Sequence, residues 1–144
     1  MAGIEDVAKL AGVSTATVSR ALTGKAHVSA KTRALVDAAA KQLDYVASSS
    51  AYTLATGRNR NIGLVLPYID RWYFSAMLEA IDTTFAANGY DLTIYNLSGG
   101  ISHRERIFSD FLLRKRVDGV LTVAVALSES ELESLSRVKK PILV

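Results

Sequence analysis

A helical pattern of apolar positions opens the chain. The residues at the i, i+3, i+4 and i+7 positions of the first predicted helix are Ile4, Val7, Ala8 and Ala11. Gly12 predicts the end of this helix, and Ser14 stands where the N-cap of a second helix, residues 15–22, belongs. At 100° per residue, Val18 and Ala21 of the second helix face one way and its polar residues the other.

A third helix follows after Gly24, which ends the second one. Ser29 is the predicted N-cap of this third helix. We assign its inward stripe to Thr32, Leu35, Ala39 and Leu43. Two short helices joined by a three-residue turn with a glycine, and closed by a third helix, predict a helix-turn-helix.

Continuous apolar runs alternate with amphipathic stretches from residue 62 onward. The predicted strands are residues 62–68, 91–96, 119–125 and 141–144. The predicted helices between them are residues 73–87, 102–116 and 129–136. In the second of these helices we expect Ile107, Phe111 and Leu112 to be buried. Apolar strands separated by helices indicate a doubly wound parallel sheet of the α/β class, covered on both faces.

The stretch between these two regions has the composition of a linker, with three serines, one glycine and two arginines in VASSSAYTLATGRNRN. We therefore divide the chain into an all-α headpiece, a hinge and an α/β core. The boundaries are residues 1–47, 48–61 and 62–144.

Positive charge is concentrated at the N-terminal end. Residues 1–61 hold eight Lys/Arg and four Asp/Glu, a net +4, whereas residues 62–144 hold nine and ten, a net −1. This distribution favours a polyanionic partner for the N-terminal part. The chain has no cysteine and two histidines, so we expect no disulfide, no metal site and no cofactor. It has no signal-peptide core and no run of eighteen apolar residues, so we expect a cytoplasmic protein without a membrane partner.

The outward arc of the second helix carries Thr15, Ala16, Ser19 and Arg20. A helix fits the DNA major groove, and an arginine fork can bond O6 and N7 of one guanine. Methyl groups of Thr15 and Ala16 can contact thymine, and short hydroxyls such as Ser14, Thr17 and Ser19 suit phosphates. Taken alone, Arg20 is better explained as a solvated surface arginine.

Three strings together carry a family resemblance: DVAKLAGVSTATVSRALTG, HVSAKTRALVDAAAKQLDY and LATGRNRNIGLVLP. They closely resemble the N-terminal portion of the LacI/GalR (lactose-repressor) family, and the match extends over essentially all 144 residues. The resemblance implies a transcriptional repressor, not an enzyme, that binds a pseudo-palindromic double-stranded operator as a homodimer at the nucleoid. It also implies a core similar to periplasmic sugar-binding proteins, which takes a sugar-like effector in a full-length form.

The resemblance assigns DNA contacts position by position. Base contacts fall on Thr15, Ala16 and Arg20. Contacts to phosphates or neighbouring DNA fall on Ser14, Thr17, Ser19, His27, Ser29 and Thr32. Tyr45 takes the place of the aromatic residue that closes the headpiece.

The hinge carries one further implied contact, at Leu54. By resemblance Leu54 enters the minor groove at the operator centre, where it unstacks a base step and bends the duplex. A helix of seven to nine residues is marginal alone, so we expect it to form on DNA beside its dimer mate, capped by Ser48 or Ser49. The chain departs from the family in two places: Val46–Ser48 replace the family's Arg-Pro-Asn at the hinge entry, and Tyr52 replaces an arginine. Loss of the proline makes the hinge entry less rigid, and loss of the basic groups removes phosphate contacts. Composition alone would make this segment a flexible linker.

The loop after the first predicted strand holds the effector candidates: Asp70, Arg71, Trp72, Tyr73 and Phe74. Open parallel sheets bind ligands at the carboxyl ends of their strands, and aromatic rings beside charged groups suit a sugar. Trp72 and Phe74 could equally just cover the sheet edge. Residues 125–128, after the third strand, are a weaker candidate. Because family members are more than twice as long, we expect an incomplete first lobe that binds no sugar with measurable affinity.

Other polar groups have simpler explanations. Ser102 and His103 are adjacent in sequence, which is a poor geometry for a nucleophile and its base, and this argues against an enzyme. Glu129, Glu131 and Glu133 are expected on a solvated helix face. Residues 114–116 (Arg-Lys-Arg) could bind an anion, but at a helix C-terminus they complement the helix dipole, which we take as the better explanation.

Overall fold

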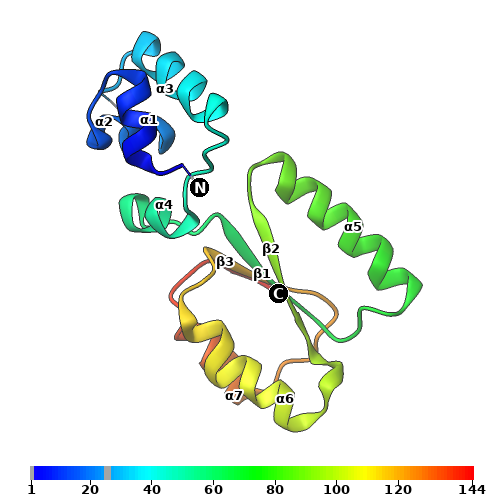
Figure 1. The fold of residues 1–144 in the computed structure, drawn as a ribbon. Coiled ribbons are helices and arrows are strands. Elements are labelled where there is room, and N and C mark those ends of the chain that lie inside the picture. The colour runs from blue at the N-terminus through cyan, green and yellow to red at the C-terminus, as the bar shows by residue number, and fades with distance from the viewer. Residues whose placement is uncertain (1, 25–26) are drawn as a thin grey trace. The chain divides into compact units, whose positions relative to one another are not determined.

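The chain divides after Arg58 into two units, Met1–Arg58 and Asn59–Val144. They are described by a computed structural model that covers residues 2–24 and 27–144 (Figure 1). The first unit is entirely helical within the described residues, and the second holds a sheet with helices on its two faces.

Three helices of the first unit share one small core. They are α1 (Ile4–Ala11), α2 (Thr15–Leu22) and α3 (Ala30–Gln42), and α4 (Ser49–Thr56) follows them. Val7, Val18 and Val36 are fully buried, and the rest of the buried core is alanine, contributed by Ala8, Ala21, Ala39 and Ala40. Leu43 and Tyr45 pack against this core from its rim. The predicted end of α1 at Gly12 and the predicted bounds of α2, residues 15–22, are confirmed.

The predicted inward stripe of α3 is correct at Ala39 and Leu43 and wrong at Leu35. Leu35 is 49% exposed, and the residues that face the core are Val36, Ala39 and Ala40. Both stripes satisfy the helical period, so periodicity could not choose between them. Helices that meet through valine and alanine approach closely, and this close contact accommodates Val36 better than the larger Leu35.

Four parallel strands form the sheet of the second unit in the order β2-β1-β3-β4. They are β1 (Asn61–Leu66), β2 (Asp91–Asn96), β3 (Gly119–Thr122) and β4 (Ile142–Leu143). The strand predicted over residues 91–96 is confirmed. The strand predicted over residues 119–125 is too long, because β3 ends at Thr122 and Ala124 adopts a left-handed φ of 52°.

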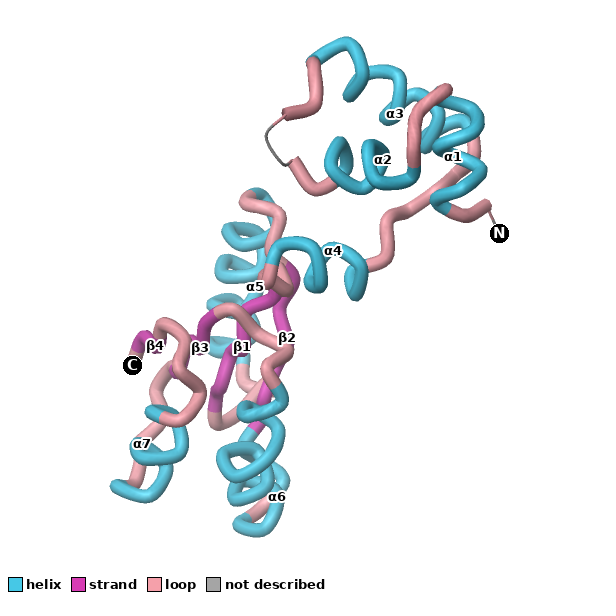
Figure 2. Tube along the Cα trace, turned by 90° about the vertical axis from the view of Figure 1, so that its left-hand side faces the viewer, coloured by secondary structure: helices cyan, strands magenta, loops and turns pink. Residues whose placement is uncertain are grey.

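Helices cover the two faces of this sheet, with α5 (Trp72–Ala87) on one side and α6 (Ile101–Arg106) and α7 (Glu129–Ser136) on the other (Figures 1 and 2). Val65 of β1 joins the core formed with the α6 and α7 side, while its neighbours Leu64 and Leu66 are buried on the opposite face. The predicted fold class, a helical headpiece followed by a parallel α/β sheet, is confirmed.

The single helix predicted over residues 102–116 is wrong in its middle. After α6 the chain makes a π turn, Ile107–Phe111, and a short 3-10 segment, Leu112–Arg114. A π turn rotates each residue by a smaller angle than an α-helix does, which moves Phe111 to the rim of the core. Phe108 is buried with Ile107 and Leu112, whereas Phe111 is half-buried.

Candidate nucleic-acid interface

The turn between α1 and α2 is set by Gly12 and Ser14. Gly12 adopts a left-handed φ of 67°, which glycine reaches at no steric cost, and ends α1. The Val13 N–H donates to the Ala8 carbonyl at 3.0 Å, and the Ser14 hydroxyl oxygen accepts from the Thr17 N–H at 3.2 Å to cap α2. This local geometry starts α2 with a defined orientation against α1.

The outer face of α2 is exposed at the residues that the sequence assigns to base contacts. Thr15, Ala16 and Arg20 are exposed, while Val18 and Ala21 are buried on the opposite face. Ser19 is half-buried at the edge of the exposed face. Among the residues that the structure describes, none forms an ion pair with the Arg20 guanidinium. The five donors of this group therefore remain available to an external acceptor.

Two hydroxyl pairs mark the N-termini of α2 and α3. Ser14 Oγ lies 2.9 Å from Thr17 Oγ1, and Ser29 Oγ lies 2.8 Å from Thr32 Oγ1. Ser29 also accepts from the Thr32 N–H at 3.0 Å, which confirms its role as an N-cap. Each pair has two hydroxyl protons and uses one between its members, so one proton remains for a phosphate oxygen. Capping and phosphate binding are therefore compatible at these four residues.

His27 lies in the connection between α2 and α3, of which residues 25 and 26 are outside the described part. Its side chain is exposed and its φ is 78°. Histidine enters the left-handed region more readily than most residues with a Cβ.

Leu54 stands on the outside of α4 and is 90% exposed. Thr53 and Thr56 donate to carbonyls one turn earlier, at 2.9 Å and 2.8 Å, and Gly57 ends the helix with a φ of 72°. Ser48 occupies the N-cap position, but its side chain makes no capping bond, so the predicted serine cap is absent.

The core candidates gather at the carboxyl end of β1. Arg71 is the N-cap residue of α5, and its guanidinium carbon lies 4.3 Å from the centroid of the Tyr68 ring. Edge-to-face contacts join Tyr73 to Phe74 at 5.5 Å and to Trp72 at 6.1 Å. Trp72 is 83% exposed, and Asp70 is also exposed. Sequence reasoning missed Tyr68 because the strand predicted over residues 62–68 included it, whereas β1 ends at Leu66.

A separate open hollow of about 710 Å³ lies between α6, α7 and the loop after β3. Arg104 donates to both carboxylate oxygens of Glu131, at 2.5 and 2.8 Å, and to the Ala126 carbonyl at 2.7 Å. The bonds from Arg104 lower the pKa of Glu131, and those from Glu131 raise the pKa of Arg104. Glu131 is thus a half-buried ion-pair partner and not the solvated residue that we expected. Ser128 lines this hollow, but none of residues 70–74 does.

Two further features are missing from residues 2–24 and 27–144. They contain no group of three or more His, Asp or Glu side chains able to hold a metal ion. They also contain no helix that is long and apolar enough to cross a membrane.

Comparisons with known proteins extend this picture. Residues 3–48 match the family model described as "Bacterial regulatory proteins, lacI family". The HTH-type transcriptional repressor PurR of Vibrio atlanticus is 36% identical over 137 residues, which is 95% of this chain and 41% of the relative. The same repressor from Pectobacterium carotovorum is 39% identical over 123 residues, 85% of this chain and 36% of the relative. The chain thus spans about two fifths of the length of these relatives, which are repressors and not enzymes.

Solved structures agree over nearly the whole chain. A lac repressor dimer bound to operator and the anti-inducer ONPF is 27% identical, with a TM-score of 0.78 over 98% of this chain and 43% of that one. A LacI-family regulator from Silicibacter pomeroyi is 28% identical, with a TM-score of 0.78 over 99% of this chain and 42% of that one. Sequence and fold agree from the helix-turn-helix through the parallel sheet, and the chain matches the N-terminal portion of proteins of the lacI family of bacterial regulatory proteins.

Proposed function

We propose that this protein is a sequence-specific DNA-binding repressor that recognises a pseudo-palindromic operator as a homodimer. The observation that carries the proposal is the outer face of α2, where Thr15, Ala16 and Arg20 are exposed beside a capped helix N-terminus. In this proposal α2 enters the major groove, and Arg20 donates two hydrogen bonds to one guanine.

Phosphate contacts fix the register of α2 on the duplex. They come from the spare hydroxyl protons of the Ser14–Thr17 and Ser29–Thr32 pairs, with Ser19 and His27 beside them. These contacts carry no sequence information, so specificity rests on the α2 face.

The hinge, residues 48–61, joins the headpiece, residues 1–47, to the core, residues 62–144. We assign the exposed Leu54 side chain to the minor groove at the operator centre, where unstacking a base step bends the duplex. An eight-residue helix is marginal in isolation, so DNA and the second protomer stabilise α4.

A small-molecule effector is the remaining partner. The exposed rings of Trp72 and Tyr73, with Asp70, Arg71 and Phe74, suit the apolar face and hydroxyls of a sugar-like molecule in a full-length form. Effector binding then shifts the dimer between DNA-binding and released states. Because its target is DNA, this regulator acts in the cytoplasm.

Selection from a random duplex pool, followed by anisotropy titrations at several salt concentrations, tests the proposal. A selected symmetric site should bind at physiological salt, while random duplex should bind more weakly and with steep salt dependence. Arg20→Ala should cost about 1–3 kcal/mol at one base position and relax specificity there. Lys41→Ala, an exposed charge near the end of α3, is the matched control. Equal weakening on all sequences would contradict the base contact of Arg20, and the absence of any selected site would contradict the proposed function.

A further inference from the structure

One edge of the sheet is strongly basic. Strands of a parallel sheet start at the same edge, and here the segments just before β1, β3 and β4 carry five basic residues: Arg60, Lys115, Arg116, Lys139 and Lys140. We call these five residues the basic rim. Residues 59–144 hold ten Lys/Arg and ten Asp/Glu, so the unit has no net charge, yet half of its basic residues gather at this edge. Asp91 opens β2 and Asp118 directly precedes β3, so these strand starts carry five basic and two acidic residues, a net +3.

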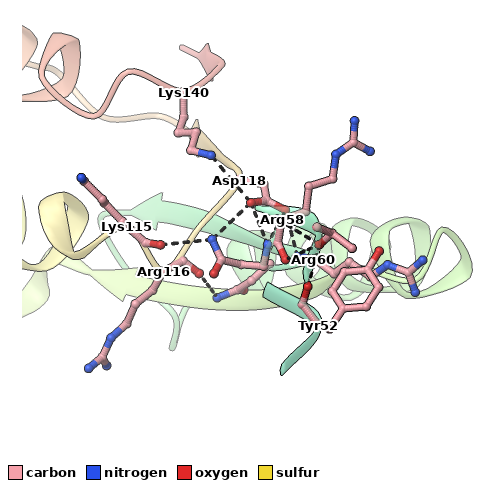
Figure 3. A network of polar contacts seen from close by, with 10 residues as sticks. Tyr52, Arg58, Arg60, Lys115, Arg116, Asp118 and Lys140 are labelled. Atoms are coloured by element: carbon pink, nitrogen blue, oxygen red, sulfur yellow. Dashed lines mark hydrogen bonds and ion pairs between the residues drawn. The ribbon is translucent and has the colours of Figure 1, made fainter. Parts of the chain in front are cut away.

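A single carboxylate ties the rim together. Asp118 accepts from the Asn59 N–H at 2.9 Å and the Arg60 N–H at 2.8 Å, and the Lys140 ammonium lies 4.0 Å away (Figure 3). The Asn59 side chain donates to the Lys115 carbonyl at 3.1 Å. The chain that enters β1 is therefore held against the segments that enter β3 and β4.

The side chains of Lys115 and Arg116 take no part in this network. Only their carbonyl groups accept bonds, that of Arg116 from the Asn61 side chain at 3.0 Å, and Figure 3 shows both side chains extending away from Asp118. Lys115, Arg116 and Lys139 are exposed, and no described residue forms an ion pair with any of them. Arg104 and Arg114 of the same unit, in contrast, are each paired with a carboxylate.

Backbone conformation adds an independent observation. Arg60, Lys115 and Lys139 have left-handed φ values of 51°, 55° and 53°. Glycine adopts this conformation freely, whereas residues with a Cβ do so under strain. At three positions of this edge a basic side chain therefore stands where glycine would be less strained, and Lys115 is also the C-cap of the 3-10 segment.

The rim is also close to the hinge along the chain. Only Gly57, Arg58 and Asn59 separate the last residue of α4 from Arg60, and four Cα–Cα steps span at most about 14 Å. A duplex bound by α4 therefore brings its phosphates within reach of long side chains at this edge. This step rests on the proposed function.

We propose that the basic rim is a second DNA-binding site, in which Lys115, Arg116 and Lys139 bind backbone phosphates of the duplex beside the hinge. The contacts are electrostatic and independent of base sequence, so they add equal affinity to selected and random duplexes.

The double variant Lys115→Gln/Arg116→Gln tests this site by anisotropy on the selected duplex over a salt series. Loss of two phosphate contacts reduces the slope of log K against log salt by about 1.8. If the lost contribution vanishes at 1 M salt, this slope corresponds to binding that is about 30-fold weaker at 0.15 M. The same loss is expected on random duplex, and thermal unfolding should be unchanged because only backbone groups of these two residues join the network.

Arg106→Gln/Arg114→Gln is the matched control, since it removes the same charge from the same segment. Both guanidinium groups lie over the Phe111 ring, at 5.2 and 4.6 Å, and Arg114 is paired with Asp110. This control should leave the salt slope almost unchanged. Equal salt slopes for wild type and the rim variant would overturn the second site. Equal losses of affinity in the rim and control variants would overturn it too, because they would show that only the net charge of the unit matters. If the rim fails either test but wild type still selects a symmetric duplex and Arg20→Ala relaxes that selection, the proposed function stands without the rim.

Discussion

The headpiece, α1 to α3, presents Thr15, Ala16 and Arg20 from one exposed helix face, whereas the core gathers Tyr68, Arg71 and Phe74 across the end of a strand and the start of a helix. In the headpiece the candidate residues are neighbours along one helix, so their relative positions follow from helical geometry. In the core, the basic rim comes from three segments that only the sheet brings together. The comparison separates sites made by local structure from sites made by tertiary assembly.

The largest expected effect comes from breaking the headpiece alone. Val18→Asp puts a carboxylate at a fully buried position, which costs about 3–5 kcal/mol, as much as a core of this size supplies. Amide exchange should lose protection in α1–α3 and keep it in β1–β3, because the two cores share no residue. Ala34→Asp, at an exposed position of α3, is the control and should retain protection throughout. Loss of protection in the strands as well would mean that the two units unfold together.

A smaller effect is expected at the ion pair that joins α6 to α7. Glu131→Gln weakens the bonds from Arg104 and should cost about 1–2 kcal/mol after allowance for the partial exposure of Arg104. The pKa of Glu131 is lowered in the folded state. The ion pair therefore contributes fully to stability above the ordinary pKa of 4.5, and this contribution is lost as the pH falls through the pKa of the folded state. Urea unfolding of the second unit should therefore lose stability below pH 4.5 more steeply in wild type than in the variant. Parallel pH profiles would contradict this role.

The smallest effect concerns two serines at N-cap positions. Ser14→Ala removes a bond to the Thr17 N–H and should cost the headpiece about 1 kcal/mol. Ser48→Ala is the matched change at α4, where the hydroxyl makes no cap bond, and should cost only a few tenths of that. Urea titration followed by circular dichroism compares the two variants. Equal costs would show that the serines act through helix propensity and not through capping.

Local signals predicted much of this molecule correctly. Gly12, Ser14 and Ser29 delimit helices as expected, since a left-handed turn or a capping hydroxyl acts within four residues of itself. The helix over residues 129–136 also has its predicted bounds. The exposed positions of Thr15, Ala16 and Arg20 followed from the same short-range geometry.

Errors arose where a choice depended on distant residues. Leu35 and Val36 both fit a helical stripe, and the close contact of α3 with α1 and α2 decided for Val36. Phe111 lies at the rim of the core and not inside it, because of a π turn that the helical period does not encode. Glu131 looked solvated because its partner Arg104 lies 27 residues away in the chain.

The sequence by itself determined the helix-turn-helix, the alternation of strands and helices and the exposed face of α2, because these depend on turns, caps and periods within a few residues. Tertiary structure alone decided the strand order, the Arg104–Glu131 pair and the gathering of the basic rim around Asp118. Their partners lie 27 to 59 residues apart in sequence. Contacts over such separations form only when the chain folds back on itself, so that the parallel sheet aligns the starts of its strands and brings α6 beside α7 on one face.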